Sequence, residues 1–165
     1  ELWLVFSFIA LTKLRSDWRY IPLSLLFFYL FLDDLLFVHE RGGRLIGSWF
    51  NFPARFGLEP EYQGEIVVST IAASFFAVII GGSYWLGNQS FRHTCHRIAV
   101  LLAGLVVCGI VIDALHTIFA ESTFGRIGIF DFLEEGGEML FMSGLCWYGV
   151  ALLRRELALS TESTV

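Results

Sequence analysis

Four long apolar segments leave this chain few ways to fold. They cover residues 20–38, 66–86, 98–120 and 132–153, and each is close to the roughly 20 residues that a helix needs to cross a bilayer. Hydrophobic residues make up 56% of the chain and charged residues only 16%, whereas soluble domains carry about 25% charged residues. Runs of this kind favour helices, which satisfy their own backbone polar groups inside lipid. The sequence therefore predicts an all-α integral membrane protein.

The opening stretch ELWLVFSFIALT is apolar but too short for a full span, and we interpret it as the end of a first helix. The predicted fold is a bundle of about five transmembrane helices, of which the first is partial. It forms a single domain over residues 1–155, followed by a short polar C-terminal tail over 156–165.

The basic residues predict an orientation. If the helices alternate in direction, seven of the 11 Lys and Arg residues fall on one side of the membrane. That group is Lys13, Arg15, Arg19, Arg92, Arg97, Arg154 and Arg155, and the opposite group is Arg41, Arg44, Arg55 and Arg126. Because Lys and Arg concentrate in cytoplasmic loops, we expect the N-terminus outside and the C-terminus in the cytoplasm, in a bacterial inner (plasma) membrane.

Acidic residues gather near the outer ends of the predicted helices, within segments that are otherwise apolar. Asp33 and Glu40 are seven residues apart, and on one continuous helix they would share a face. A charge that faces lipid at this depth is unfavourable by about 2.5–3.5 kcal/mol on insertion scales. We therefore expect these side chains to face the bundle interior or a water-filled cavity. The acidic and histidine residues concerned are Asp33, Asp34, His39, Glu40, Asp113, His116, Glu134, Glu135 and Glu138.

Carboxylates packed this closely repel one another unless they are protonated, paired with arginine or bridged by a cation. Asp and Glu together with His form a ligand set that suits a divalent Zn, Fe or Mn ion. Asp113 and His116 have the i, i+3 spacing of the Glu-x-x-His pairs of di-metal helical bundles, with Asp in place of Glu. We assign Asp33 and Asp34 as candidate catalytic groups. The candidate metal ligands are Asp113, His116, Glu134, Glu135, Glu138, His39 and Glu40, and no haem is expected among so many acids.

Each of these residues also has a purely structural interpretation. Asp33 and Asp34 could cap a helix end or reach water, and Asp113 with His116 could form an internal hydrogen bond between helices. Glu134 could be a first-turn acid favoured by the helix dipole.

Two further patterns concern packing. Gly109, Gly136, Gly137 and Gly144 predict that the fourth and fifth helices approach closely. The aromatic stretch RLIGSWFNFPARFG, in the outer segment 40–65, could lie along the membrane interface, cover the polar site or dock a partner.

Three functions fit these observations. The first is a metal-binding protein, in its enzymatic form one in which a metal-activated water attacks a lipid-like substrate. The second is a non-catalytic accessory subunit of a larger membrane complex, and the third is a proton- or cation-coupled transporter. The expected partners are the lipid bilayer and other membrane subunits or further copies of the chain, and no nucleic acid.

Overall fold

The computed structural model describes residues 1–50, 60–112, 115 and 129–162, and these residues form helices joined by short turns, without a strand. The elements are α1 (Leu2–Arg15), the 3₁₀ helix η1 (Trp18–Tyr20), α2 (Ile21–Leu36), α3 (Val38–Phe50), α4 (Pro60–Trp85), α5 (Gln89–Val106), the π-helical η2 (Val107–Ile112) and α7 (Ile129–Glu162). The predicted all-α class is confirmed. α7 extends through Glu162, so most of the segment that we separated as a polar tail continues the last helix.

Three helical stretches are long and apolar enough to cross a membrane, namely Pro60–Trp85, Gln89–Gly109 and Glu135–Thr161. The pair Trp18–Leu36 and Val38–Phe50 would make a fourth span, which is bent by 71° at its break. α1 has 14 residues, fewer than the roughly 20 that a full span requires. The described part of the chain therefore holds three or four helices of membrane-spanning length.

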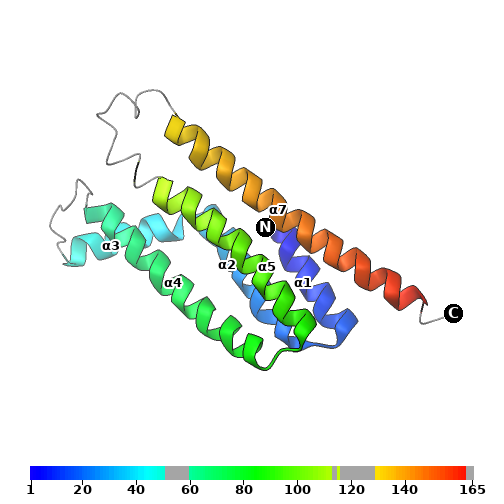
Figure 1. Ribbon diagram of the computed structural model, residues 1–165. Helices are drawn as coiled ribbons and strands as arrows, with labels where there is room; N and C mark the ends of the chain where they lie inside the picture. Colours follow the sequence, from blue (N-terminus) through cyan, green and yellow to red (C-terminus); the bar gives the residue numbers. More distant parts are fainter. Residues whose placement is uncertain (51–59, 113–114, 116–128, 163–165) are drawn as a thin grey trace.

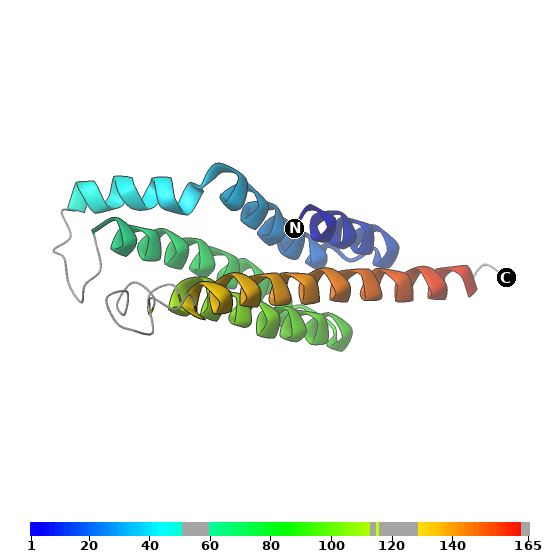
Figure 2. The ribbon, with the colours of Figure 1, turned by 90° about the horizontal axis from the view of Figure 1, so that it is seen from above.

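The long helices lie side by side in an elongated bundle, and α3 turns away from α2 at one end (Figures 1 and 2). Figure 1 shows the end of α5 and the start of α7 at that same end. The turns between α1 and α2 and between α4 and α5 lie at the opposite end, toward which the C-terminus points. The elements that carry the predicted site are thus collected at one end of the bundle.

A compact aromatic core joins α1, η1, α2 and α5. Phe8 stacks on Phe27 with the ring centroids 5.6 Å apart, and Tyr20 meets Phe91 edge to face at 5.0 Å. All four side chains are fully buried, and Leu145 of α7 packs into the same cluster. Burying aromatic rings of this size supplies much of the packing energy between helices.

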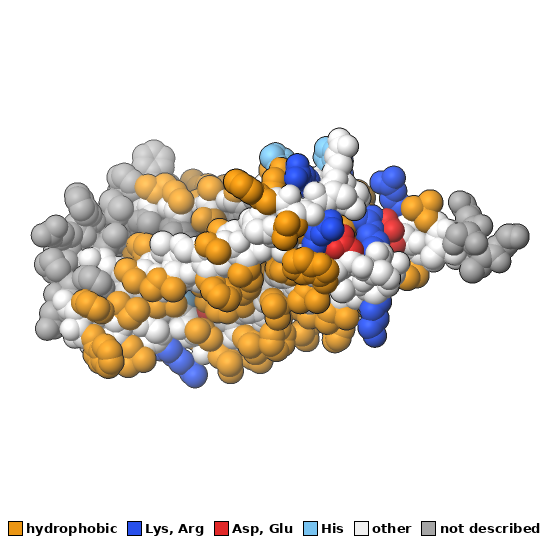
Figure 3. Space-filling model, turned by 90° about the horizontal axis from the view of Figure 1, so that it is seen from below, with side chains coloured by type: hydrophobic (Ala, Val, Ile, Leu, Met, Phe, Trp, Pro, Cys, Tyr) orange, Lys and Arg blue, Asp and Glu red, His pale blue; other side chains and the backbone are white. Residues whose placement is uncertain are grey.

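The outer surface of the bundle is largely apolar. Ile71, Phe75 and Val78 of α4 are 61%, 59% and 74% exposed. Hydrophobic side chains cover much of one long face, and Lys and Arg gather mainly near the end where the C-terminus lies (Figure 3). An apolar belt with charges toward one end is compatible with a membrane location.

α3 is held against the start of α4 by glycines. Gly43 and Gly47 form a Gly-x-x-x-Gly pair on α3, and both are buried. A Cβ added at Gly64 of α4 would lie 2.1 Å from the carbonyl oxygen of Gly43, and one added at Gly47 would lie 2.6 Å from that of Pro60. Only glycine allows backbones this close. The sequence predicts a span that ends near residue 38. That α3 follows α2 directly and packs on α4 was not predicted.

Glycines also line the contact of α5 and η2 with α7, as predicted. A Cβ at Gly137 would meet the Cys108 sulfur at 2.3 Å, and one at Gly144 would meet Leu101 at 3.3 Å. Gly109 faces Glu138 across the same contact. Beside Gly136 no described atom lies within 4 Å, so its predicted contact stays a prediction.

The α3–α4 contact gives a direct test. We expect Gly64→Ala to lower the free energy of unfolding by about 1–3 kcal/mol, because the new methyl group would overlap the backbone of α3. Gly82→Ala, on the same helix with no described neighbour within 4 Å, should be neutral or slightly stabilising, since alanine favours helix more than glycine. Thermal unfolding of both variants in detergent, followed by circular dichroism, makes the comparison. Equal melting temperatures for the two variants would contradict the close contact.

Candidate functional site

The side chain of Asp33 joins α2 to α3 across the bend. One of its oxygens accepts a hydrogen bond from the backbone nitrogen of His39 at 2.9 Å, and the other lies 2.8 Å from Nδ1 of the His39 ring. The Asp33 side chain is 14% exposed and that of His39 is 34% exposed. Asp33 therefore satisfies a free N–H in the first turn of α3 and fixes the imidazole ring at the same time.

The backbone at the bend explains why this pairing is possible. Phe37 adopts a left-handed conformation, with φ 53° and ψ 48°, and its N–H bonds to the carbonyl oxygen of Asp33. That conformation ends α2 and lets α3 start one residue later in a new direction. The expectation that Asp33 and Glu40 share a face was wrong, because it assumed one continuous helix. The bend instead brings His39 onto the Asp33 carboxylate.

The geometry gives the His39 ring one defined reactive atom. Nδ1 is engaged by Asp33, so Nε2 on the far side of the ring remains as the atom that can bind a ligand or exchange a proton. Carboxylate–histidine pairs of this type orient metal-binding and general-base histidines. The carboxyl group of Glu1, at the start of α1, lies beside that of Asp34, the residue next to Asp33 in α2, and the two groups interact electrostatically. Nothing in the sequence pattern points to Glu1, because its contact with α2 is made only in the folded bundle.

A second carboxylate lies where α7 crosses η2. Because Gly109 has no side chain, an oxygen of Glu138 occupies the space beside it. A Cβ added at Gly109 would lie 2.2 Å from Oε1 of Glu138. η2 is a π-helix, a form that is rare and is often found at functional sites. Glu138 is half-buried in this contact. Gly109 thus admits the carboxylate to the helix interface.

The remaining predicted site residues are placed as follows. Glu40 is half-buried in the first turn of α3, and Glu134 and Glu135 lie in the first turns of α7, where Glu135 is exposed. Asp113 and His116 lie outside the described residues. Within the described residues, no group of three or more His, Cys, Asp or Glu side chains converges as a metal site. The structure brings Asp33 and His39 together directly, and the start of α7 lies at the same end of the bundle as α3 (Figure 1).

Residues 2–152 match a family described as a domain of unknown function, DUF8692. The chain belongs to this family. No curated protein and no solved structure matches the chain. The match begins in α1 and runs into the second half of α7, so both the bend and the α7 carboxylates lie within the family's domain.

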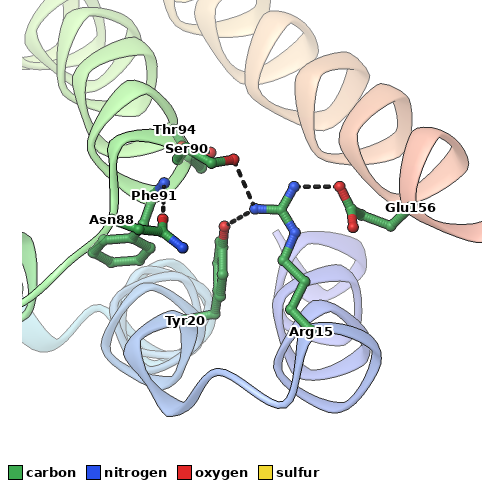
Figure 4. A network of polar contacts seen from close by, with 7 residues as sticks. All are labelled: Arg15, Tyr20, Asn88, Ser90, Phe91, Thr94 and Glu156. Atoms are coloured by element: carbon green, nitrogen blue, oxygen red, sulfur yellow. Dashed lines mark hydrogen bonds and ion pairs between the residues drawn. The ribbon is translucent and has the colours of Figure 1, made fainter. Parts of the chain in front are cut away.

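The opposite end of the bundle holds a polar cluster centred on Arg15 (Figure 4). Its guanidinium donates hydrogen bonds to the hydroxyl of Tyr20, to the hydroxyl of Ser90 at 3.1 Å and to the carboxylate of Glu156, with which it forms an ion pair. The Arg15 and Glu156 side chains are only 18% and 15% exposed. One side chain thus ties together four elements, α1, η1, α5 and α7. This cluster could not be predicted from the sequence, because Arg15 and Glu156 are 141 positions apart and no local pattern links them.

The bend depends on Asp33 in a way that can be measured. We expect Asp33→Ala to cost about 0.5–2 kcal/mol of stability through loss of the cap. The backbone amide of His39 should exchange with deuterium faster, because its hydrogen-bond acceptor is gone. Asp34→Ala, the neighbouring carboxylate that does not bond to α3, is the matched control. If hydrogen exchange at His39 is the same in both variants, Asp33 is not the cap.

The Arg15 cluster gives a second test of stability. We expect Arg15→Ala to lower the free energy of unfolding by about 1.5–3 kcal/mol, because hydrogen bonds to a charged group are lost and Glu156 is left without its cation. Arg154→Ala removes an exposed arginine from the same end and should change stability by less than about 0.5 kcal/mol. Chemical unfolding in detergent compares the two. Similar values for both variants would show that the cluster contributes little.

Proposed function

We propose that this chain is a multi-pass membrane protein whose outer end binds a divalent metal ion at the His39 ring. In this proposal five segments lie in a bacterial inner membrane, α1 among them as a partial one, with the N-terminus outside and the C-terminus in the cytoplasm. The bend between α2 and α3 then lies at the outer end. The Arg15 cluster lies at the cytoplasmic end, among most of the basic residues.

The observation that carries the proposal is the pairing of Asp33 with His39. Histidines that bind metals usually donate the second ring N–H to a carboxylate, which fixes the tautomer and makes the free nitrogen a better ligand. Asp33 is 2.8 Å from Nδ1 of His39 and mostly buried, so it suits that role. In this proposal Asp33 is then an orienting group and not the catalytic group that we assigned from the sequence. His39 Nε2 is the proposed metal ligand.

The other ligands in this proposal are candidates from the sequence, since within the described residues no three His, Cys, Asp or Glu side chains converge. Glu138 is admitted to the interface of α7 and η2 by Gly109. Asp113 and His116 are the further candidates from the sequence. A metal ion held by His and carboxylate side chains can lower the pKa of a bound water, which gives a nucleophile at neutral pH. The substrate class that this location favours is an amphipathic, lipid-like molecule that reaches the site from the bilayer.

Metal content of the purified protein tests the proposal. We expect stoichiometric Zn, Fe or Mn by elemental mass spectrometry in the wild-type protein and its loss in His39→Ala. Asp33→Asn should weaken metal affinity by about 10- to 100-fold, as removal of an orienting carboxylate does at other sites. The control is His93→Ala, which removes an exposed histidine from the start of α5 at the opposite end.

Folding must be measured alongside metal content, because an unfolded variant also loses metal. Each variant is therefore compared by its melting temperature and by size-exclusion chromatography. A folded wild-type protein without bound metal would refute the proposal, and so would a His39→Ala variant that retains its metal.

A further inference from the structure

The orientation of α3 is fixed at two places. Asp33 holds the first turn through His39, and the glycine face of α3 packs on the start of α4. These contacts are independent, since one lies at the start of the helix and the other extends to Gly47. One side of α3 therefore packs against α4, and the opposite side of α3 faces away from it.

The opposite side of α3 carries an apolar strip of side chains next to a basic strip. Leu45 and Trp49, four residues apart, form one strip and are 63% and 83% exposed. Arg41, Arg44 and Ser48 are spaced by three and four residues, form the neighbouring strip and are also exposed. No described residue covers the Leu45–Trp49 strip. An amphipathic helix with an aromatic and aliphatic side next to a basic side is typical of helices that lie in a membrane interface.

Exposed apolar side chains also lie at the end of α2 and at the bend. Leu35, Leu36 and Phe37, at the bend itself, are 58%, 45% and 49% exposed. α2 and α3 together have the length and composition of one bent span. If the exposed side chains of α2 and the bend face lipid, the strip on α3 adds a further apolar surface directly after them in the chain.

We propose that α3 lies in the outer lipid interface, with Leu45 and Trp49 among the upper acyl chains and Arg41 and Arg44 at the lipid phosphates. Tryptophan favours the interface because its ring is apolar and its N–H is polar. The two arginines are complementary in charge to phosphate groups. This inference rests on the membrane placement proposed above but is independent of the metal site. The partner is thus a phospholipid surface rather than a second protein.

Probes on the two strips test this directly. Leu45→Cys and Ser48→Cys, each made in a variant whose three native cysteines are replaced with alanine, are labelled with an environment-sensitive fluorophore and reconstituted into vesicles of phosphatidylcholine and phosphatidylglycerol. We expect the label at 45 to emit at shorter wavelength and to be quenched by nitroxide-labelled lipid. The label at 48 should be quenched several-fold more strongly by aqueous iodide than the label at 45.

The outcomes separate the alternatives. Equal quenching by iodide at 45 and 48 would overturn the proposal, because the strip would then face water. Protection of the label at 45 from both iodide and lipid quencher would also overturn it, since a protein would cover the strip. Resistance of the reconstituted protein to alkaline extraction reports membrane insertion separately. Failure of insertion would refute the proposed membrane placement itself.

The native chain allows a second measurement should the cysteine-free variant fail to fold. The difference in tryptophan fluorescence between wild type and Trp49→Phe isolates the signal of Trp49. We expect this difference signal to be quenched by phospholipids brominated near the top of the acyl chain. A difference signal that brominated lipid leaves unchanged would contradict the interfacial position of α3.

Discussion

A helix that ends in or near a membrane must satisfy its free backbone groups without help from water, and Asp33 does this at the bend between α2 and α3. Its carbonyl oxygen accepts the N–H of Phe37, and its carboxylate accepts that of His39. These two hydrogen bonds at the bend help to set the direction of α3. The placement of the His39 ring and the exposure of Trp49 on the far side of α3 follow from that direction. A structural cap and a candidate functional group are therefore the same residue.

The two ends of the bundle are stabilised by different means. At the end near the C-terminus, Arg15 links four elements by charged hydrogen bonds, and buried aromatic rings pack beneath it. At the other end, glycines bring backbones together, and Glu138 enters a helix interface beside a π-helix. Close backbone packing leaves little side-chain volume between helices. The second end can thus accommodate polar groups that a tightly filled aromatic core would exclude.

The helical class and the apolar segments could be predicted from the sequence, because length and composition decide whether a helix can cross a membrane. The glycines at 109, 137 and 144 were also predicted correctly as contacts of α7 with α5 and η2. The bend was not predictable in this way, because a left-handed phenylalanine at Phe37 has no sequence signature of its own. The pairing of Asp33 with His39 follows from the bend, so a helical wheel drawn through Phe37 misplaces both residues. The Arg15–Glu156 pair depends on tertiary packing alone.

The bend also changes which roles the acids can have. As part of a continuous helix, Asp33 would be one of several carboxylates that repel each other, and a cation would be the simplest remedy. In the structure its two oxygens are already engaged by the N–H and the ring of His39. Of the two side chains, the imidazole and not the Asp33 carboxylate is therefore the one that keeps an atom outside the pair, Nε2. The carboxylate holds the ring in one orientation, so a single, mostly buried acid determines the direction in which the outer nitrogen of the imidazole points.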